Sequence, residues 1–139
     1  GFDVLQTITL MAQAGKLDET AGIETHTGAR GFRNTPVWAE HLLTDTEKTT
    51  VFTGSAKEAI VTFPRRVNVA VATSLATTGP DITQVTMHSV PRWTGDDHCI
   101  TAEIDGVKAT VDICSSTSAI AGWSAVALLR NLASPVCFY

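Results

Sequence analysis

The chain has 139 residues and a mass of 14.8 kDa, which predicts one compact domain. Hydrophobic residues make up 44% of it and charged residues 17%, a composition that excludes a disordered or fibrous protein. No apolar run reaches the ~18 residues of a membrane span, and an odd number of cysteines, three, argues against a secreted disulfide scaffold. The net charge is −4, but the segment 59–92 carries three arginines and a single aspartate, which favours an anionic partner.

The N-terminal part of the sequence predicts a hairpin. Two apolar stretches, 4–10 and 22–27, form its strands, so that the hairpin spans about 4–28. The following stretch, 35–59, is ambiguous. Thr35-Pro36 is able to start a short helix, and Ser55 with Glu58 has capping-box spacing, but either piece is also compatible with a strand. We favour a strand for 60–63.

The middle of the chain predicts a second antiparallel hairpin. In 66–72, Arg-Val-Asn-Val-Ala-Val-Ala, valines alternate with other residues, which is typical of a half-buried strand. Turn residues follow at 78–81, and alternation resumes in 82–90. The polar faces of these two predicted strands would share one side of a sheet. That side would present five side chains: Arg66, Asn68, Gln84, Thr86 and His88.

The last third predicts further strands and then one helix. Within 100–114 the apolar residues occupy even-numbered positions before Asp105-Gly106 and odd-numbered positions after it. This change indicates either a tight hairpin or one bulged strand, and the hairpin is favoured. Serines and a threonine at 115–118 offer N-caps for a helix over 119–132, which Ser134-Pro135 ends. This helix is apolar almost all round, so it must be buried on more than one side. A second chain would supply the missing surface.

The sequence contains none of the motifs that mark common enzymes. G-x-S-x-G, a P-loop and G-x-G-x-x-G are absent, and the four histidines lack ligand spacing. A hydrolase based on His98 or His26 would need a base and a nucleophile that we cannot assemble. The run Asp96-Asp97-His98-Cys99 fits a solvated loop better than a metal site. The sequence therefore predicts no enzyme, no cofactor and no metal.

The polar side of the central hairpin carries donors suited to phosphates and unstacked bases, although an ordinary solvent-facing sheet explains it more simply.

One family resemblance favours the nucleic-acid interpretation. A basic pair followed by alternating valines (65–72), a turn, and a partner strand ending near Pro91 resembles the coat proteins of single-stranded RNA bacteriophages, the leviviruses. The strand 107–113 leading into a helix with Ala-Leu-Leu, the Ala-Ser-Pro after it and the final tyrosine extend the resemblance over about 59–139.

The resemblance implies an α+β coat-protein domain over 1–139, with a central antiparallel sheet at about 59–114 and a helix at about 116–133. Two subunits would form an intertwined homodimer with one continuous sheet, and dimers would assemble into an icosahedral shell around genomic RNA. As in well-known members of that family, the same sheet would bind an RNA operator hairpin and repress translation. Its partners would be itself and single-stranded RNA, with no membrane, and its location the virion, assembled in the bacterial cytoplasm. The segment 100–113 would then be one bulged strand.

The resemblance also implies roles for individual residues, including an inter-subunit cross-link at Cys99. The alternative from another class is a small β-barrel or sandwich that binds an apolar ligand. The implied RNA-binding residues are Arg66, Asn68, Gln84, Thr86, His88, Lys108 and Thr110; the inter-subunit loop holds Trp93, Asp96, Asp97, His98 and Cys99; and the dimer helix presents Ile120, Trp123, Val126 and Leu129.

Overall fold

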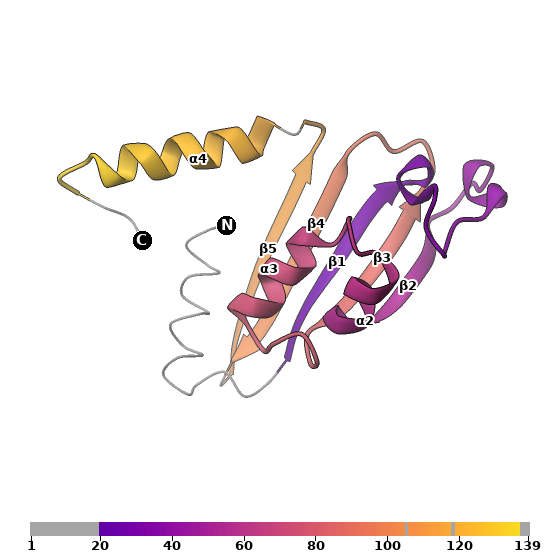
Figure 1. Cartoon of the computed structure of the whole chain (residues 1–139), viewed down its shortest axis with the longest axis horizontal. Coiled ribbons are helices and arrows are strands. Elements are labelled where there is room, and N and C mark those ends of the chain that lie inside the picture. The colour runs from indigo at the N-terminus through magenta and orange to yellow at the C-terminus, as the bar shows by residue number, and fades with distance from the viewer. Residues whose placement is uncertain (1–19, 105, 118, 137–139) are drawn as a thin grey trace.

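The computed structural model describes residues 20–104, 106–117 and 119–136, and these form one mixed β-sheet with helices packed on one face (Figure 1). None of the described helices is both long enough and apolar enough to cross a membrane. In chain order the elements are β1 (Thr20–Gly28), the short 3-10 helices η1 (Ala29–Phe32) and η2 (Glu40–Leu43), β2 (Thr49–Ser55), α2 (Ala56–Thr62), α3 (Asn68–Ala76), β3 (Gln84–Val90), β4 (Asp96–Ile104), β5 (Val107–Ser115) and α4 (Ala119–Leu132).

The strands lie in the order β2-β3-β1-β4-β5. β1 and β3 are parallel, with Ile23 beside Val85 and His26 beside His88, whereas the other three neighbouring pairs are antiparallel. β1 therefore occupies the centre of the sheet. Its pairing with both β3 and β4 brings segments more than sixty residues apart in sequence side by side.

The core lies between the sheet and the helices α2 and α3, which cover one face (Figure 1). Alternate residues of β1 and β3 point into it, as the period of a strand requires, and aromatic residues from the connecting segments complete it. The opposite face, which we call the open face, carries no helix among the described residues. The central members of the core are Ile23, Phe32, Ala59, Phe63, Val67, Ala70, Val85, Met87 and Ile100.

Two predicted strands are helices in the structure, so the central antiparallel hairpin is wrong. Ser55 caps α2 in a complete capping box with Glu58, and α2 occupies most of the stretch for which we favoured a strand. The alternating segment 66–72 begins α3 instead of a strand. Val67, Ala70 and Thr73 are buried at helical spacing of three, and Ser74 is buried beside them, whereas Val69 and Val71 are only partly buried.

The C-terminal half agrees better with the sequence. β3 lies where a strand was expected, with Val85 and Met87 toward the core. β4 and β5 are two antiparallel strands joined at Gly106, whose φ of 78° suits glycine, so the hairpin interpretation is confirmed and the single bulged strand is wrong. The predicted loop 91–99 is corrected too, because β4 starts at Asp96 and pairs on both sides.

The ends of the chain complete the comparison. The first strand of the expected N-terminal hairpin, 4–10, lies outside the described residues, and the second lies within β1, which pairs with β3 and β4. The α4 helix occupies the expected C-terminal position and extends away from the edge strand β5 (Figure 1). A single domain over 1–139 stays a prediction.

Candidate functional site

A cavity of about 280 Å³ lies between the sheet and the start of α3. Its floor is formed by β1 and β4, and its walls by η1 and the segment that leads into α3. This volume is near the lower end of the ~300–1,000 Å³ typical of small-molecule sites. The cavity is lined by Thr25, Thr27, Gly31, Phe32, Phe63, Arg66, Asn68, Met87, Asp96 and His98.

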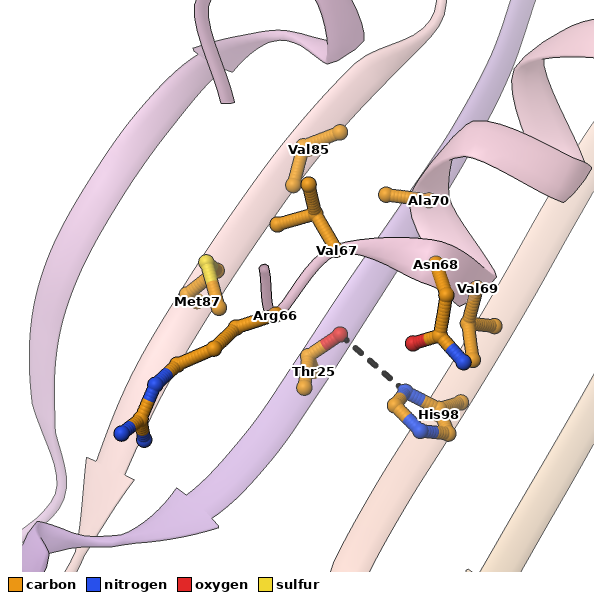
Figure 2. A pocket seen from close by; sticks show the side chains of 9 residues that line it. All are labelled: Thr25, Arg66, Val67, Asn68, Val69, Ala70, Val85, Met87 and His98. Atoms are coloured by element: carbon orange, nitrogen blue, oxygen red, sulfur yellow. Dashed lines mark hydrogen bonds between the residues drawn. The ribbon is translucent and has the colours of Figure 1, made fainter. Parts of the chain in front are cut away.

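The sheet register places two polar pairs on the cavity floor. Thr25 is the cross-strand neighbour of His98, and its Oγ1 lies 3.2 Å from His98 Nδ1 in a hydrogen bond (Figure 2). Two residues along, Thr27 donates a 3.0 Å hydrogen bond to Asp96 Oδ1. Successive same-face positions of an antiparallel pair thus present an imidazole and then a carboxylate to the same hollow.

Asn68 and Arg66 approach these groups from the opposite wall. The Asn68 side chain, on the first residue of α3, points toward the His98 ring (Figure 2). The Arg66 side chain runs the other way, and its guanidinium donates to the carbonyl of Gly31 and, at 3.3 Å, to that of Arg33. Arg66 therefore fixes the loop beside η1 and adds a positive charge to the cavity wall.

Burial lowers the pKa of the His98 imidazole below its ordinary value of 6.5, although Asp96 and Asp97 act in the opposite direction. The ring is consequently neutral at pH 7. When one nitrogen of a neutral imidazole donates its N–H to a hydroxyl oxygen, the other nitrogen has a free lone pair and is able to accept a proton.

A second polar cluster lies on the open face. Glu24 and His26 flank Thr25 on β1 and so point to the other side of the sheet, where they meet His88 of β3. Glu24 Oε1 lies 2.6 Å from His88 Nε2, and Lys48 Nζ lies 3.5 Å from Glu24 Oε1. Burial, followed by the charge of Lys48, lowers the pKa of His88.

The structure divides the residues to which RNA binding was assigned. Arg66 and Asn68 lie on the helix-covered side of the sheet, because the segment that holds them is not a strand. The others do lie on the open face, but β1 and β4 separate those on β3 from those on β5. They therefore form no continuous patch. The open-face members are Gln84, Thr86, His88, Lys108 and Thr110.

The residues assigned to an inter-subunit loop are also divided. Trp93 precedes β4, Asp96 and His98 line the cavity, and Asp97 and Cys99 point to the open face. The sequence interpretation missed Thr25, Thr27 and Glu24. Alternation in 22–27 could have assigned each of them to a face of a strand, but their partners are about seventy residues away, and nothing in the sequence links them.

The residues assigned to the dimer helix are all on α4 and are exposed. Their exposed fractions range from 41% for Ile120 to 66% for Leu129.

Comparison with known proteins gives a consistent result. The sequence model of the family described as "Aspartate dehydrogenase, C-terminal" matches residues 8–132. L-aspartate dehydrogenase 3 of Bordetella bronchiseptica is 36% identical over 115 residues, covering 76% of this chain and 42% of its own length. L-aspartate dehydrogenase of Bradyrhizobium diazoefficiens is 38% identical over 93 residues, covering 63% and 33%.

A solved structure agrees. The crystal structure of aspartate dehydrogenase from Thermotoga maritima superposes with a TM-score of 0.75 at 27% identity, covering 100% of this chain and 52% of that one. The chain thus spans between about a third and about half of the length of these relatives.

These matches overturn the virus interpretation. The fold is a mixed sheet similar to that of the Thermotoga protein, not the antiparallel sheet of a levivirus coat dimer. The relatives are named as enzymes of bacteria and archaea, so the capsid function, the virion location and the expectation of no enzyme are wrong, and an apolar-ligand barrel gains no support. The alternating valines of 66–72 and the apolar helix therefore did not identify a coat protein. With 8–132 matched, this chain belongs to the family of aspartate dehydrogenase C-terminal domains.

Proposed function

We propose that this chain provides the substrate-binding and acid–base part of an L-aspartate dehydrogenase, with the cavity at His98 as its site. The observation that carries the proposal is the position of the His98 imidazole on the cavity floor, held through Nδ1 by Thr25 and faced by the Asn68 amide (Figure 2). We take L-aspartate as the substrate because the relatives are named L-aspartate dehydrogenases.

The chemistry of amino-acid oxidation suits this arrangement. A hydride leaves the carbon that bears the amino group, a proton leaves the nitrogen, and water converts the resulting imine into a ketone and ammonia. In the tautomer whose Nδ1–H donates to Thr25 Oγ1, Nε2 carries the free lone pair and is the atom that would accept a proton from the amine or from the attacking water.

The cavity wall also suits a dicarboxylate. Arg66 and the N-terminal end of α3, which begins at Asn68, place positive potential on one side, and both favour carboxylates. Asp96 lies on the opposite side, where it would attract the ammonium group. The separation of charges would orient an amino acid with its amine toward the sheet.

The hydride acceptor needs a site beyond this cavity. A dehydrogenase of this kind passes hydride to a dinucleotide, and the usual cradle is a G-x-G-x-x-G turn, which the 139 residues lack. The residues present do not fit a dinucleotide in that way. The proposal therefore covers the substrate side only.

The test is a titration of the chain with L-aspartate, followed by NMR. We expect saturable shifts at His98, Asn68 and Thr25. L-asparagine, which has one carboxylate fewer, should bind more weakly. His98→Asn keeps a polar partner for Thr25 but removes Nε2, and should weaken binding about tenfold, the size of one lost hydrogen bond to a charged group.

The matched control is His41→Asn, because His41 is an exposed histidine paired with Asp45 outside the cavity. It should bind L-aspartate as the unmodified chain does. Shifts confined to another surface, or equal affinity in the His98 variant, would refute the assignment.

A further inference from the structure

The open face of the sheet holds three metal-ligating side chains that the proposed substrate site does not use. Glu24 and His26 come from β1, and His88, the register partner of His26, comes from β3. One donor atom from each lies within 4.8 Å of the other two. The alternation of β1 separates this cluster from the cavity, because Thr25 between them points to the other side.

The distance from Glu24 to His26 matches that between two ligands of a small metal ion, and the distance from Glu24 to His88 is shorter, as in an ion pair. Glu24 Oε1 lies 2.6 Å from His88 Nε2 and 3.4 Å from His26 Nε2. Tetrahedral Zn²⁺ has bonds of about 2.0–2.2 Å, which places neighbouring donors roughly 3.3 Å apart. The two imidazole rings are stacked, with centroids 4.8 Å apart and planes at 24°, so both rings lie on the same side of the sheet beside the Glu24 carboxylate.

Burial and a hydrogen bond from its other ring nitrogen fix the position of the His88 side chain. Its side chain is 6% exposed, and its Nδ1 lies 3.0 Å from Thr50 Oγ1 in a hydrogen bond. That bond orients the ring so that Nε2 faces Glu24, to whose carboxylate the Nε2–H donates. A metal ion would replace the proton on Nε2, as ligation by histidine requires. Metal-binding histidines commonly have such a second partner on the other ring nitrogen.

A cation already occupies this place. Lys48 Nζ lies 3.3 Å from His26 Nε2 and 3.5 Å from Glu24 Oε1. Its side chain is half exposed, so it can swing into solvent at little cost. A metal ion would replace the ammonium group between the same atoms.

We propose that Glu24, His26 and His88 form a binding site for a divalent transition metal ion, of which Zn²⁺ fits best. Two imidazoles and one carboxylate favour Zn²⁺ over Mg²⁺ or Ca²⁺, which prefer oxygen donors. The fourth position is left to water, and Lys48 competes with the ion.

The test is calorimetric titration of the chain with Zn²⁺, together with the visible spectrum of bound Co²⁺. We expect one ion per chain and the intense visible absorption of tetrahedral Co²⁺. His26→Asn and Glu24→Gln should each lower affinity at least tenfold. Lys48→Met should raise it, because the competing ammonium is removed.

Two sets of controls make the outcome decisive. His41→Asn changes an exposed histidine with its own carboxylate partner, Asp45, and should leave affinity unchanged. Cys99→Ser and Cys114→Ser test the free thiols of the part of the chain that the structure describes, since Cys99 is the register neighbour of Glu24. Loss of binding in either cysteine variant, or unchanged binding in the His26 and Glu24 variants, would overturn the site.

The change in melting temperature on adding Zn²⁺ tests a variant of His88, the buried residue of the three, which is able to lose binding simply by failing to fold. Zn²⁺ should raise the Tm of the unmodified chain and of Lys48→Met, because an ion that binds only the folded state stabilises it. His88→Gln should show no such rise, and circular dichroism without metal reports whether it is folded. If it is folded and the rise persists, the proposal is wrong.

Discussion

His98 shows how the cavity sets the chemistry of a single side chain. Burial disfavours the imidazolium, and the effect exceeds the opposing pull of Asp96 and Asp97. We expect the NMR titration midpoint of His98 to lie below 6.5. Asp96→Asn should lower it further, because a charge that favours protonation is removed. A midpoint at or above 6.5 in the unmodified chain would contradict this account of the site.

The same shift links His98 to stability. When the folded-state pKa is below the unfolded one, the unfolded chain binds more protons, so stability falls as pH drops from about 6.5 toward the folded pKa and is constant above 6.5 as far as this group is concerned. His98→Asn should reduce this part of the pH dependence. Urea unfolding at pH 5 and at pH 7.5 measures the difference, with His41→Asn as the control for an exposed histidine.

For single residues, the sequence predicted the face of a strand on which a side chain lies better than it predicted which other residues that side chain contacts. It placed Gln84, Thr86 and His88 on one face of a strand, which is correct. It assigned His98 to an exposed loop and rejected it for catalysis because no partner could be assembled. Its partner, Thr25, is 73 residues away and meets it only through the register of β1 and β4. Long-range register leaves no local trace in the sequence.

At the scale of elements, capping signals were more reliable than alternation. The Ser55–Glu58 spacing, which had left both a helix and a strand open, does lie at the start of α2, whereas the valines of 66–72 indicated a strand where α3 begins. The pattern in 67–73 satisfies both periods. Tertiary burial of Val67 and Ala70 decides for the helix. The parallel pairing of β1 with β3 could not be predicted from the sequence either, because it joins strands that are not consecutive in the chain.

The capping box of α2 supports a quantitative prediction. Ser55 Oγ accepts a 3.2 Å hydrogen bond from the Glu58 amide, and the Ser55 amide donates to Glu58 Oε2 at 2.7 Å. Ser55→Ala should lower the free energy of unfolding by about 1 kcal/mol, measured by urea denaturation. Glu58→Gln keeps an acceptor and should cost less. Equal stability of Ser55→Ala and the unmodified chain would show that α2 does not depend on its cap.

For the molecule as a whole, the exposed apolar side chains of α4 are the feature that the fold does not explain. Its 14 residues include one charged side chain, Arg130. Trp123 and Leu129 are about two-thirds exposed, and the helix extends away from the sheet (Figure 1). Exposed apolar area of this kind marks an interaction site. We propose that a second copy of the chain covers α4, which retains the homodimer expected from the sequence without the shell or the RNA.

Val126→Asp tests this dimer. A charge buried without a partner costs far more than one in water, so the variant should be monomeric if α4 forms the interface. The matched control is Val61→Asp, at a valine of α2 that is 79% exposed. It should remain dimeric, because an isolated apolar residue on the surface needs no partner. Light scattering coupled to size exclusion gives the mass of each. A monomeric unmodified chain would refute the dimer, and equal effects of the two substitutions would place the interface elsewhere than α4.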